Sequence, residues 1–108
     1  SCRRRWDRRA QRSMARRRYL IAYDISDPVR LRRVIKVMEA YGQRLQYSVF
    51  LCDLSGIEVV AWSTDIQAVI KFTEDSVVRI DLGDVGVAAE IHVLGTSRRL
   101  PRQGPTIV

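Results

Sequence analysis

The sequence is poor in the residues that build thiol and metal chemistry. Of its 108 residues, only Cys2 and Cys52 are cysteines, and His92 is the single histidine. Two cysteines without a Cys-x-x-Cys spacing exclude a thiolate metal centre and a disulfide scaffold. We expect Cys52 to be a small, buried or half-buried residue in a reducing cytoplasm. Because His92 has no partner for a triad or a zinc site, we interpret it as a packed or surface histidine.

Long apolar runs and phosphate-binding glycine loops are also missing. No stretch approaches the roughly 20 apolar residues of a membrane span, so we expect no membrane partner. No apolar segment follows the basic N-terminus, which argues against a signal peptide. Neither Gly-x-Gly-x-x-Gly nor a Walker loop is present, so nucleotide-cofactor chemistry has no support. The length and a hydrophobic fraction of 46% favour one globular domain.

The positive charge lies almost entirely at one end of the chain. The formal net charge is +7, but residues 1–18 hold nine arginines and one acid, a charge of +8. The other 90 residues hold 10 basic and 11 acidic side chains, a charge of −1. We predict a disordered basic arm over residues 1–18 that could bind phosphate non-specifically. Alternatively, the chain naturally starts at Met14, and residues 1–13 are non-native.

Hydropathy patterns after the arm predict alternating strands and helices. The almost continuously apolar segment 19–25 predicts a strand buried in the centre of a sheet. Asp27 and Pro28 are typical of a helix start, and this helix is expected to run to Tyr41 and end at Gly42. Further strands are predicted at 45–54, 76–82 and 90–94, and a second helix at 55–72.

The predicted strand 45–54 has two alternating sets of side chains. The expected core face consists of Leu45, Tyr47, Val49 and Leu51. The other set is expected to face solvent, a partner or a ligand, and it consists of Arg44, Gln46, Ser48, Phe50 and Cys52. On that face, Phe50 could stack on a base or pack in a dimer interface.

These elements predict an α+β sandwich with the helices on one face of one sheet. The order is β-α-β-α-β-β, or βαββαβ if one strand is split. The ferredoxin-like fold is the obvious candidate. Residues 19–95 would form this domain, and residues 96–108 would form a tail with a short terminal strand.

Asp24 is the one acid at the end of an otherwise apolar central strand. Functional groups gather at the carboxyl ends of strands, and a carboxylate there can bind Mg²⁺, or Mn²⁺ in its place. A single acid is a poor metal site, so Asp24 would need Asp27, phosphate oxygens or its own copy from a second subunit. In the alternative interpretation, Asp24 only forms an Asx-turn.

A local excess of cations follows this strand. It consists of Arg30, Arg32, Arg33, Lys36 and Arg44, against the single acid Glu39. We predict that these residues bind a phosphate backbone by charge rather than by reading bases. The ordinary alternative is a solvated helix face.

Four segments together resemble the CRISPR-associated Cas2 family, and they are residues 19–27, 30–34, 42–50 and 75–80. The resemblance covers about residues 19–95, and residues 106–108 also look like that family's ending. It implies a ferredoxin-like homodimer whose last strand is exchanged onto the partner's sheet. It further implies a role in CRISPR spacer acquisition with the Cas1 integrase, in which the basic surface holds DNA.

The resemblance also implies a chemistry. Many family members are described as Mg²⁺-dependent endonucleases on RNA or DNA, and in that picture Asp24 is the catalytic metal ligand, paired across the dimer axis. The other matching positions of the active region are Tyr23, Arg30, Arg44, Ser48 and Phe50. Leu51 stands where many members carry an acid, and some members work without nuclease activity. A non-catalytic DNA-binding scaffold is therefore the alternative, and an unrelated ferredoxin-like module is a third hypothesis.

Overall fold

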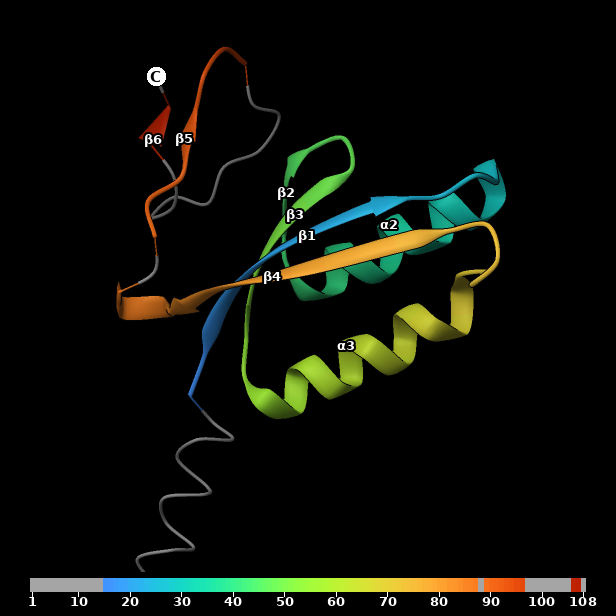
Figure 1. Ribbon diagram of the computed structural model, residues 1–108, viewed down its shortest axis with the longest axis horizontal. Helices are drawn as coiled ribbons and strands as arrows, with labels where there is room; N and C mark the ends of the chain where they lie inside the picture. Colours follow the sequence, from blue (N-terminus) through green and yellow to red (C-terminus); the bar gives the residue numbers. More distant parts are fainter. Residues whose placement is uncertain (1–14, 88, 97–105, 108) are drawn as a thin grey trace, which may run out of the picture.

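The computed structural model describes residues 15–87, 89–96 and 106–107. Most of the predicted basic arm and of the predicted tail therefore lies outside the described residues. The elements, in chain order, are β1 (Arg17–Asp24), α2 (Pro28–Tyr41), β2 (Gln43–Gln46), β3 (Val49–Leu54), α3 (Gly56–Val69), β4 (Ser76–Asp84), the 3-10 helix η1 (Val85–Val87), β5 (His92–Val93) and β6 (Thr106–Ile107) (Figure 1). None of the helices in this part of the chain is long and apolar enough to cross a membrane.

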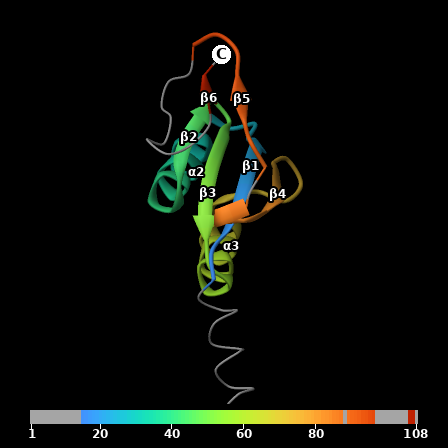
Figure 2. The same ribbon diagram turned by 90° about the vertical axis from the view of Figure 1, so that its left-hand side faces the viewer.

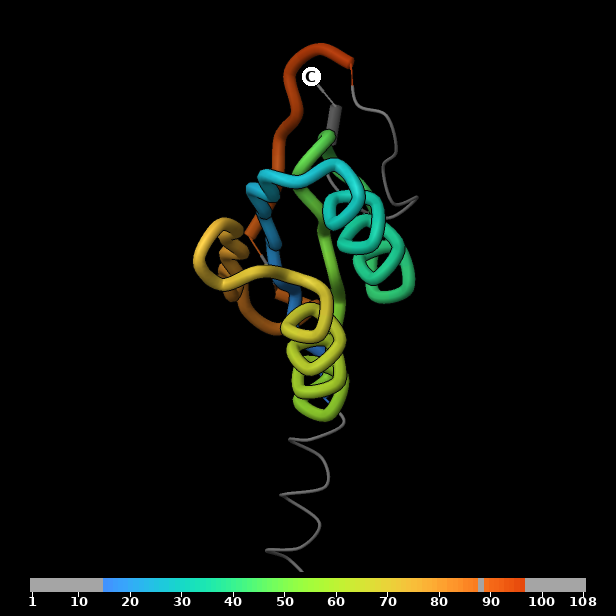
Figure 3. The backbone as a smooth tube through the Cα atoms, turned by 90° about the vertical axis from the view of Figure 1, so that its right-hand side faces the viewer, coloured from blue at the N-terminus to red at the C-terminus, as the bar shows by residue number. Residues whose placement is uncertain are grey.

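One antiparallel sheet with the strand order β2-β3-β1-β4 carries both helices on one face. The helices α2 and α3 lie side by side there (Figure 3). They bury Val34, Met38, Trp62 and Ile66 against side chains of β1 and β3. This arrangement confirms the α+β, ferredoxin-like βαββαβ fold, in the variant in which one predicted strand is split.

The split falls in the predicted strand 45–54, which is a hairpin of β2 and β3 with a turn at Tyr47 and Ser48. The prediction that Phe50 faces solvent or a partner is wrong, because Phe50 and Cys52 are fully buried against the helices. Tyr47, expected in the core, is 57% exposed in the turn. Alternation separates two sets of side chains correctly but does not say which set meets the helices.

The opposite face of the sheet carries no helix and is apolar as well. We call it the helix-free face, and it is formed by Leu20, Ala22, Val49, Leu51, Val78 and Ile80, which are paired across β3, β1 and β4. Leu51 is buried on this face, whereas the sequence pattern predicts it in the main core, so that prediction is wrong. Residues 91–94 cover part of it and line, with Leu20, Leu45, Val49 and Leu82, a pocket of about 450 Å³. β5 and β6 form a separate parallel pair next to the β2–β3 hairpin (Figure 2).

β1 begins at Arg17, two residues earlier than predicted and inside the predicted basic arm. The Arg17 guanidinium pairs with Asp81 at 2.9 Å and with Asp84 at 2.8 Å, and Arg18 pairs with Asp53 at 2.8 Å. The last two arginines of the expected arm therefore belong to the sheet, where acids of neighbouring strands compensate their charge.

The first helix has the predicted bounds. The Asp27 carboxylate accepts a hydrogen bond from the Arg30 backbone N–H at 2.9 Å, and Pro28 opens the helix. Gly42 ends α2, but with an extended φ of −163° and not in the left-handed conformation that favours glycine. The glycine is required by space, because a Cβ there would overlap Cys52 Sγ and the carbonyl oxygen of Leu51.

Candidate functional site

Asp24 is the last residue of β1, and its backbone faces Ser76 at the start of β4. Its side chain is exposed and has no hydrogen-bond or ion-pair partner among the described residues. The Asx-turn that would occupy this carboxylate is therefore not formed by any described group. A free carboxylate at the end of a central strand is available for a ligand.

The donor chemistry at Asp24 fits Mg²⁺, which prefers carboxylate oxygens and keeps several waters or phosphate oxygens. The described residues contain no group of three or more His, Cys, Asp or Glu side chains that could hold a metal ion. Asp27, considered as a second ligand, uses its carboxylate to cap α2. One described chain thus supplies one free carboxylate at this end of the sheet, and further ligands have to come from a substrate or a second copy.

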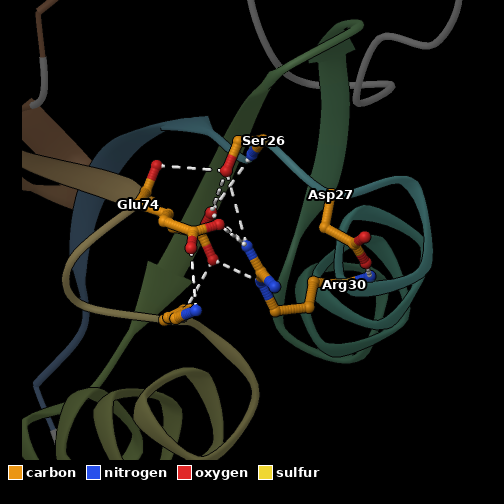
Figure 4. A network of polar contacts seen from close by, with 6 residues as sticks. Ser26, Asp27, Arg30 and Glu74 are labelled. Carbon is orange, nitrogen blue, oxygen red and sulfur yellow. Dashed lines mark hydrogen bonds and ion pairs between the residues drawn. The ribbon is translucent and has the colours of Figure 1, made fainter.

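Beside Asp24, a polar network joins the β1–α2 loop, the first turn of α2 and the α3–β4 loop (Figure 4). Arg30 Nε donates to Asp75 Oδ2 at 2.8 Å, and Arg30 Nη2 donates to Glu74 Oε1 at 3.2 Å. The side chain of Asp75 is 0% exposed and that of Arg30 is 21% exposed. The Arg30 guanidinium holds the pKa of the Asp75 carboxyl well below its usual range, and Asp75 in turn raises the pKa of Arg30.

Arg30 therefore has acidic partners inside the chain, although its predicted role is to bind phosphate. Asp75 begins the family-like segment 75–80, but nothing in the sequence marks it as a site residue. Two adjacent acids before a strand give no such signal, because the side chains that bind Asp75, those of Arg30 and Ser26, lie 45 and 49 positions away in the sequence.

A second cluster lies around Arg44 in β2. Its guanidinium carbon lies 5.7 Å from the ring centroid of Tyr47 and 5.6 Å from that of Phe50, distances typical of cation–π contacts. The Tyr23 hydroxyl donates to the Tyr47 carbonyl at 3.0 Å, and burial raises the pKa of Tyr23 while the nearby Arg44 opposes this. Ser48 contributes its backbone carbonyl, which accepts from the Tyr23 N–H at 3.1 Å.

One atom of this cluster is left without a partner. Arg44 Nε is buried and has no hydrogen-bond acceptor among the described groups. The structure thus brings Tyr23, Arg44, Ser48 and Phe50 together. By strand alternation, the neighbouring Asp24 points to the opposite side of the sheet from Tyr23.

The outer face of α2 carries the remaining predicted cations. Arg32, Arg33 and Lys36 are exposed, and none of them has an acidic partner within the described part of the chain. Their spacing of three and four residues places Arg32 and Arg33 next to Lys36 on the helix surface. Unlike Arg30, these three side chains are free to meet phosphate groups.

Comparison with known proteins identifies the family to which the chain is similar. The family model described as CRISPR associated protein Cas2 matches residues 17–88. A Rhodospirillum rubrum protein named CRISPR-associated endoribonuclease Cas2 1 is 43% identical over 83 residues, which cover 74% of this chain and 81% of that protein. A second such endoribonuclease, from Thermodesulfovibrio yellowstonii, is 39% identical over 83 residues, or 77% of this chain and 88% of that protein.

Solved structures show the same likeness. A hypothetical protein from Thermus thermophilus superposes with a TM-score of 0.69 and 27% identity, over 78% of this chain and 96% of that one. The crystal structure of Streptococcus pyogenes Cas2 at pH 6.5 superposes with a TM-score of 0.58 and 35% identity, over 61% of this chain and 86% of that one. Because the family model spans about residues 17–88, which include β1 to β4 and Asp24, this chain belongs to the CRISPR-associated Cas2 family.

Proposed function

We propose that this protein is a Mg²⁺-dependent endonuclease that cleaves RNA or DNA phosphodiesters and acts in the cytoplasm, with the Cas1 integrase, during spacer acquisition. The observation that carries the proposal is the exposed carboxylate of Asp24, which ends the central strand without a partner among the described residues. The names of the relatives support it, since the Rhodospirillum rubrum protein is named an endoribonuclease and a Thermus thermophilus relative an endonuclease.

In this proposal, Asp24 and its copy from a second subunit hold Mg²⁺ or Mn²⁺. A bound metal of this kind lowers the pKa of water and neutralises charge that develops on a phosphodiester. The exposed cations Arg32, Arg33 and Lys36 bind the phosphate backbone of the nucleic acid. Arg44, which is half-buried and has no acidic partner among the described residues, supplies a further contact for the nucleic acid.

A homodimer is part of the proposal because the helix-free face is unfinished in a single chain. Val78 is 50% exposed and Ile80 is 46% exposed on that face. The outer edge of the nine-residue strand β4 has no partner strand in the described sheet. A second copy, with its terminal strand exchanged onto this edge, would cover the apolar side chains and satisfy the open edge.

The Asp24 role is tested by comparing Asp24→Ala and Asp24→Asn with the wild-type protein. We expect Mg²⁺-dependent hydrolysis to fall by about 100-fold or more, because a ligand of the proposed metal is lost. Glu39→Ala, which removes an exposed carboxylate from α2, is the matched control and should keep wild-type activity. Unchanged hydrolysis in both Asp24 variants would contradict the proposal. Spacer acquisition that survives without hydrolysis would favour a scaffold.

The non-catalytic DNA-binding scaffold is the second candidate, and the free cations of α2 favour it. In Arg32→Ala/Arg33→Ala, we expect weaker duplex binding and a salt dependence flatter by about one unit per lost phosphate contact. Lys71→Ala is the matched control because Lys71 already pairs with Glu74 at 2.7 Å. An unchanged salt slope in the double variant would place the nucleic acid elsewhere on the surface.

A further inference from the structure

The carboxylate of Asp75 is fully buried close to Asp24 and has no role in the proposed chemistry. It accepts five hydrogen bonds. The donors are the Ser26 backbone N–H at 3.1 Å, Ser26 Oγ at 3.2 Å, Arg30 Nε at 2.8 Å, Arg30 Nη2 at 3.2 Å and the Lys71 backbone N–H at 2.8 Å. A charged acceptor with this many donors fixes three segments of the chain in one arrangement.

These bonds hold the backbone that follows Asp24 close to the start of the strand that pairs with it. Ser26, two residues after Asp24, is bound to the Asp75 carboxylate through both its N–H and its hydroxyl. Ser76, the residue after Asp75, is the partner of Asp24 in the pairing of β1 with β4. The chain around Asp24 is therefore anchored, whereas the Asp24 side chain itself has no described partner that would orient it.

We propose that Asp75 is a positioning residue for Asp24, clamping the β1–α2 loop at Ser26 and so directing the Asp24 carboxylate toward the metal and the phosphodiester. The inference rests on the proposed function of Asp24. Residues that orient a metal ligand are typically worth about 10- to 100-fold in metal affinity. A ligand without other support depends on such an anchor more strongly than a ligand in a crowded cluster.

The neighbouring acid Glu74 offers a matched control. Its carboxylate belongs to the same network, because it pairs with Arg30 at 3.2 Å and with Lys71 at 2.7 Å. Only its backbone carbonyl, and not its carboxylate, meets Ser26, at 3.3 Å. Glu74→Gln thus weakens the ion pairs of the network while it leaves the bonds between Ser26 and Asp75 in place.

The test uses Asp75→Asn, Ser26→Ala and Glu74→Gln in the full chain, each first confirmed to unfold cooperatively. Asp75→Asn removes the carboxylate charge, and in either orientation its amide N–H₂ faces at least two of the five donors, so the clamp on Ser26 should loosen. Ser26→Ala removes the hydroxyl and its bonds to Asp75, Glu74 and Arg30 but keeps the ion pair. The first readout is hydrogen exchange of the Ser26 amide without metal. The second is Mn²⁺-induced broadening of the NMR signals of residues 24–26, titrated to an apparent Kd.

We expect Asp75→Asn to speed Ser26 exchange and to weaken Mn²⁺ binding by about tenfold. Ser26→Ala should show a smaller change in the same direction, and Glu74→Gln should match the wild-type protein. The positioning role is overturned if Mn²⁺ broadens the wild-type signals but Asp75→Asn shows the same Ser26 exchange and the same Mn²⁺ affinity as Glu74→Gln. If Asp75→Asn does not fold, Ser26→Ala takes its place in this comparison. If Mn²⁺ does not broaden residues 24–26 of the wild-type protein, the proposed metal role of Asp24 is contradicted and this inference falls with it.

Discussion

The two faces of the sheet differ in how complete they are within one chain. On the helix-covered face, Ile21, Phe50 and Cys52 are 0% exposed, and α2 and α3 close over them. On the helix-free face, Val78 and Ile80 remain about half exposed, although they are as apolar as the residues of the core. The difference indicates that one face serves the fold and the other is available for association.

The charged side chains also fall into two groups, those with partners inside the chain and those without. The acids and cations that hold the fold are paired, as Arg30 is with Asp75 and Arg18 with Asp53. Asp24 and the α2 cations Arg32 and Arg33 have no partner in the described structure. Residues with partners inside the chain explain the fold, and those without partners are the better candidates for binding.

The largest effect is expected from opening the helix-covered face with Phe50→Ala. Phe50 is the largest fully buried side chain of the described residues, and its loss leaves a cavity. The free energy of unfolding should fall by about 3–5 kcal/mol, measured by denaturant titration. Tyr47→Ala, at a 57% exposed position in the adjacent turn, is the control and should cost much less. Equal losses in the two variants would remove the contrast between core and surface.

The second effect concerns association through the helix-free face. Ile80→Lys should weaken self-association by about tenfold or more, because burying one isoleucine contributes about 1.5–3 kcal/mol. Stability of the single chain should change little, since Ile80 is 46% exposed there. Sedimentation of Ile80→Lys is compared with that of Val60→Lys, a 66% exposed position on α3. Equal self-association in the two variants would exclude the helix-free face as the dimer interface.

The smallest effect is a difference in thiol reactivity between the faces. Burial raises the pKa of the Cys52 thiol to about 12, so very little thiolate forms near neutral pH and alkylation should be slow. In a Cys2→Ser background, Val78→Cys places a thiol on the helix-free face at a 50% exposed position. This thiol should react quickly in dilute protein and more slowly as concentration favours the dimer. Rapid alkylation of native Cys52 would show that the helix-covered face opens readily.

Much of the fold could be predicted from the sequence where a local signal existed. Asp27, Pro28 and Gly42 bound α2 as predicted, and Ser55 with Glu58 starts α3 through a capping box. The β2–β3 turn could not be found in the same way, because Tyr47 and Ser48 include no glycine, proline, asparagine or aspartate and the alternation continues across them. The prediction also exchanges the two faces of β3, because both faces of the sheet are apolar and alternation alone does not tell which one the helices cover.

A residue of the candidate site could be predicted only where a chemically reactive side chain directly follows a recognisable strand. Asp24 stood out because it is an acid after an apolar run. The pairing of Arg30 with Asp75 joins residues 45 positions apart, and no local pattern records it. Charge alone therefore groups Arg30 with Arg32 and Arg33, although Arg30 faces the α3–β4 loop and the other two are exposed.

The contact at Gly42 also limits which pairs of substitutions the fold can accept. A larger residue at position 42 meets two obstacles, the sulfur of Cys52 and the main-chain oxygen of Leu51. A smaller residue at position 52 could remove the sulfur, but every amino acid at position 51 keeps the carbonyl. No second-site substitution can therefore fully compensate for a change at Gly42. In a library randomised at positions 42 and 52 and selected for folding, position 42 should stay glycine while position 52 varies among small residues.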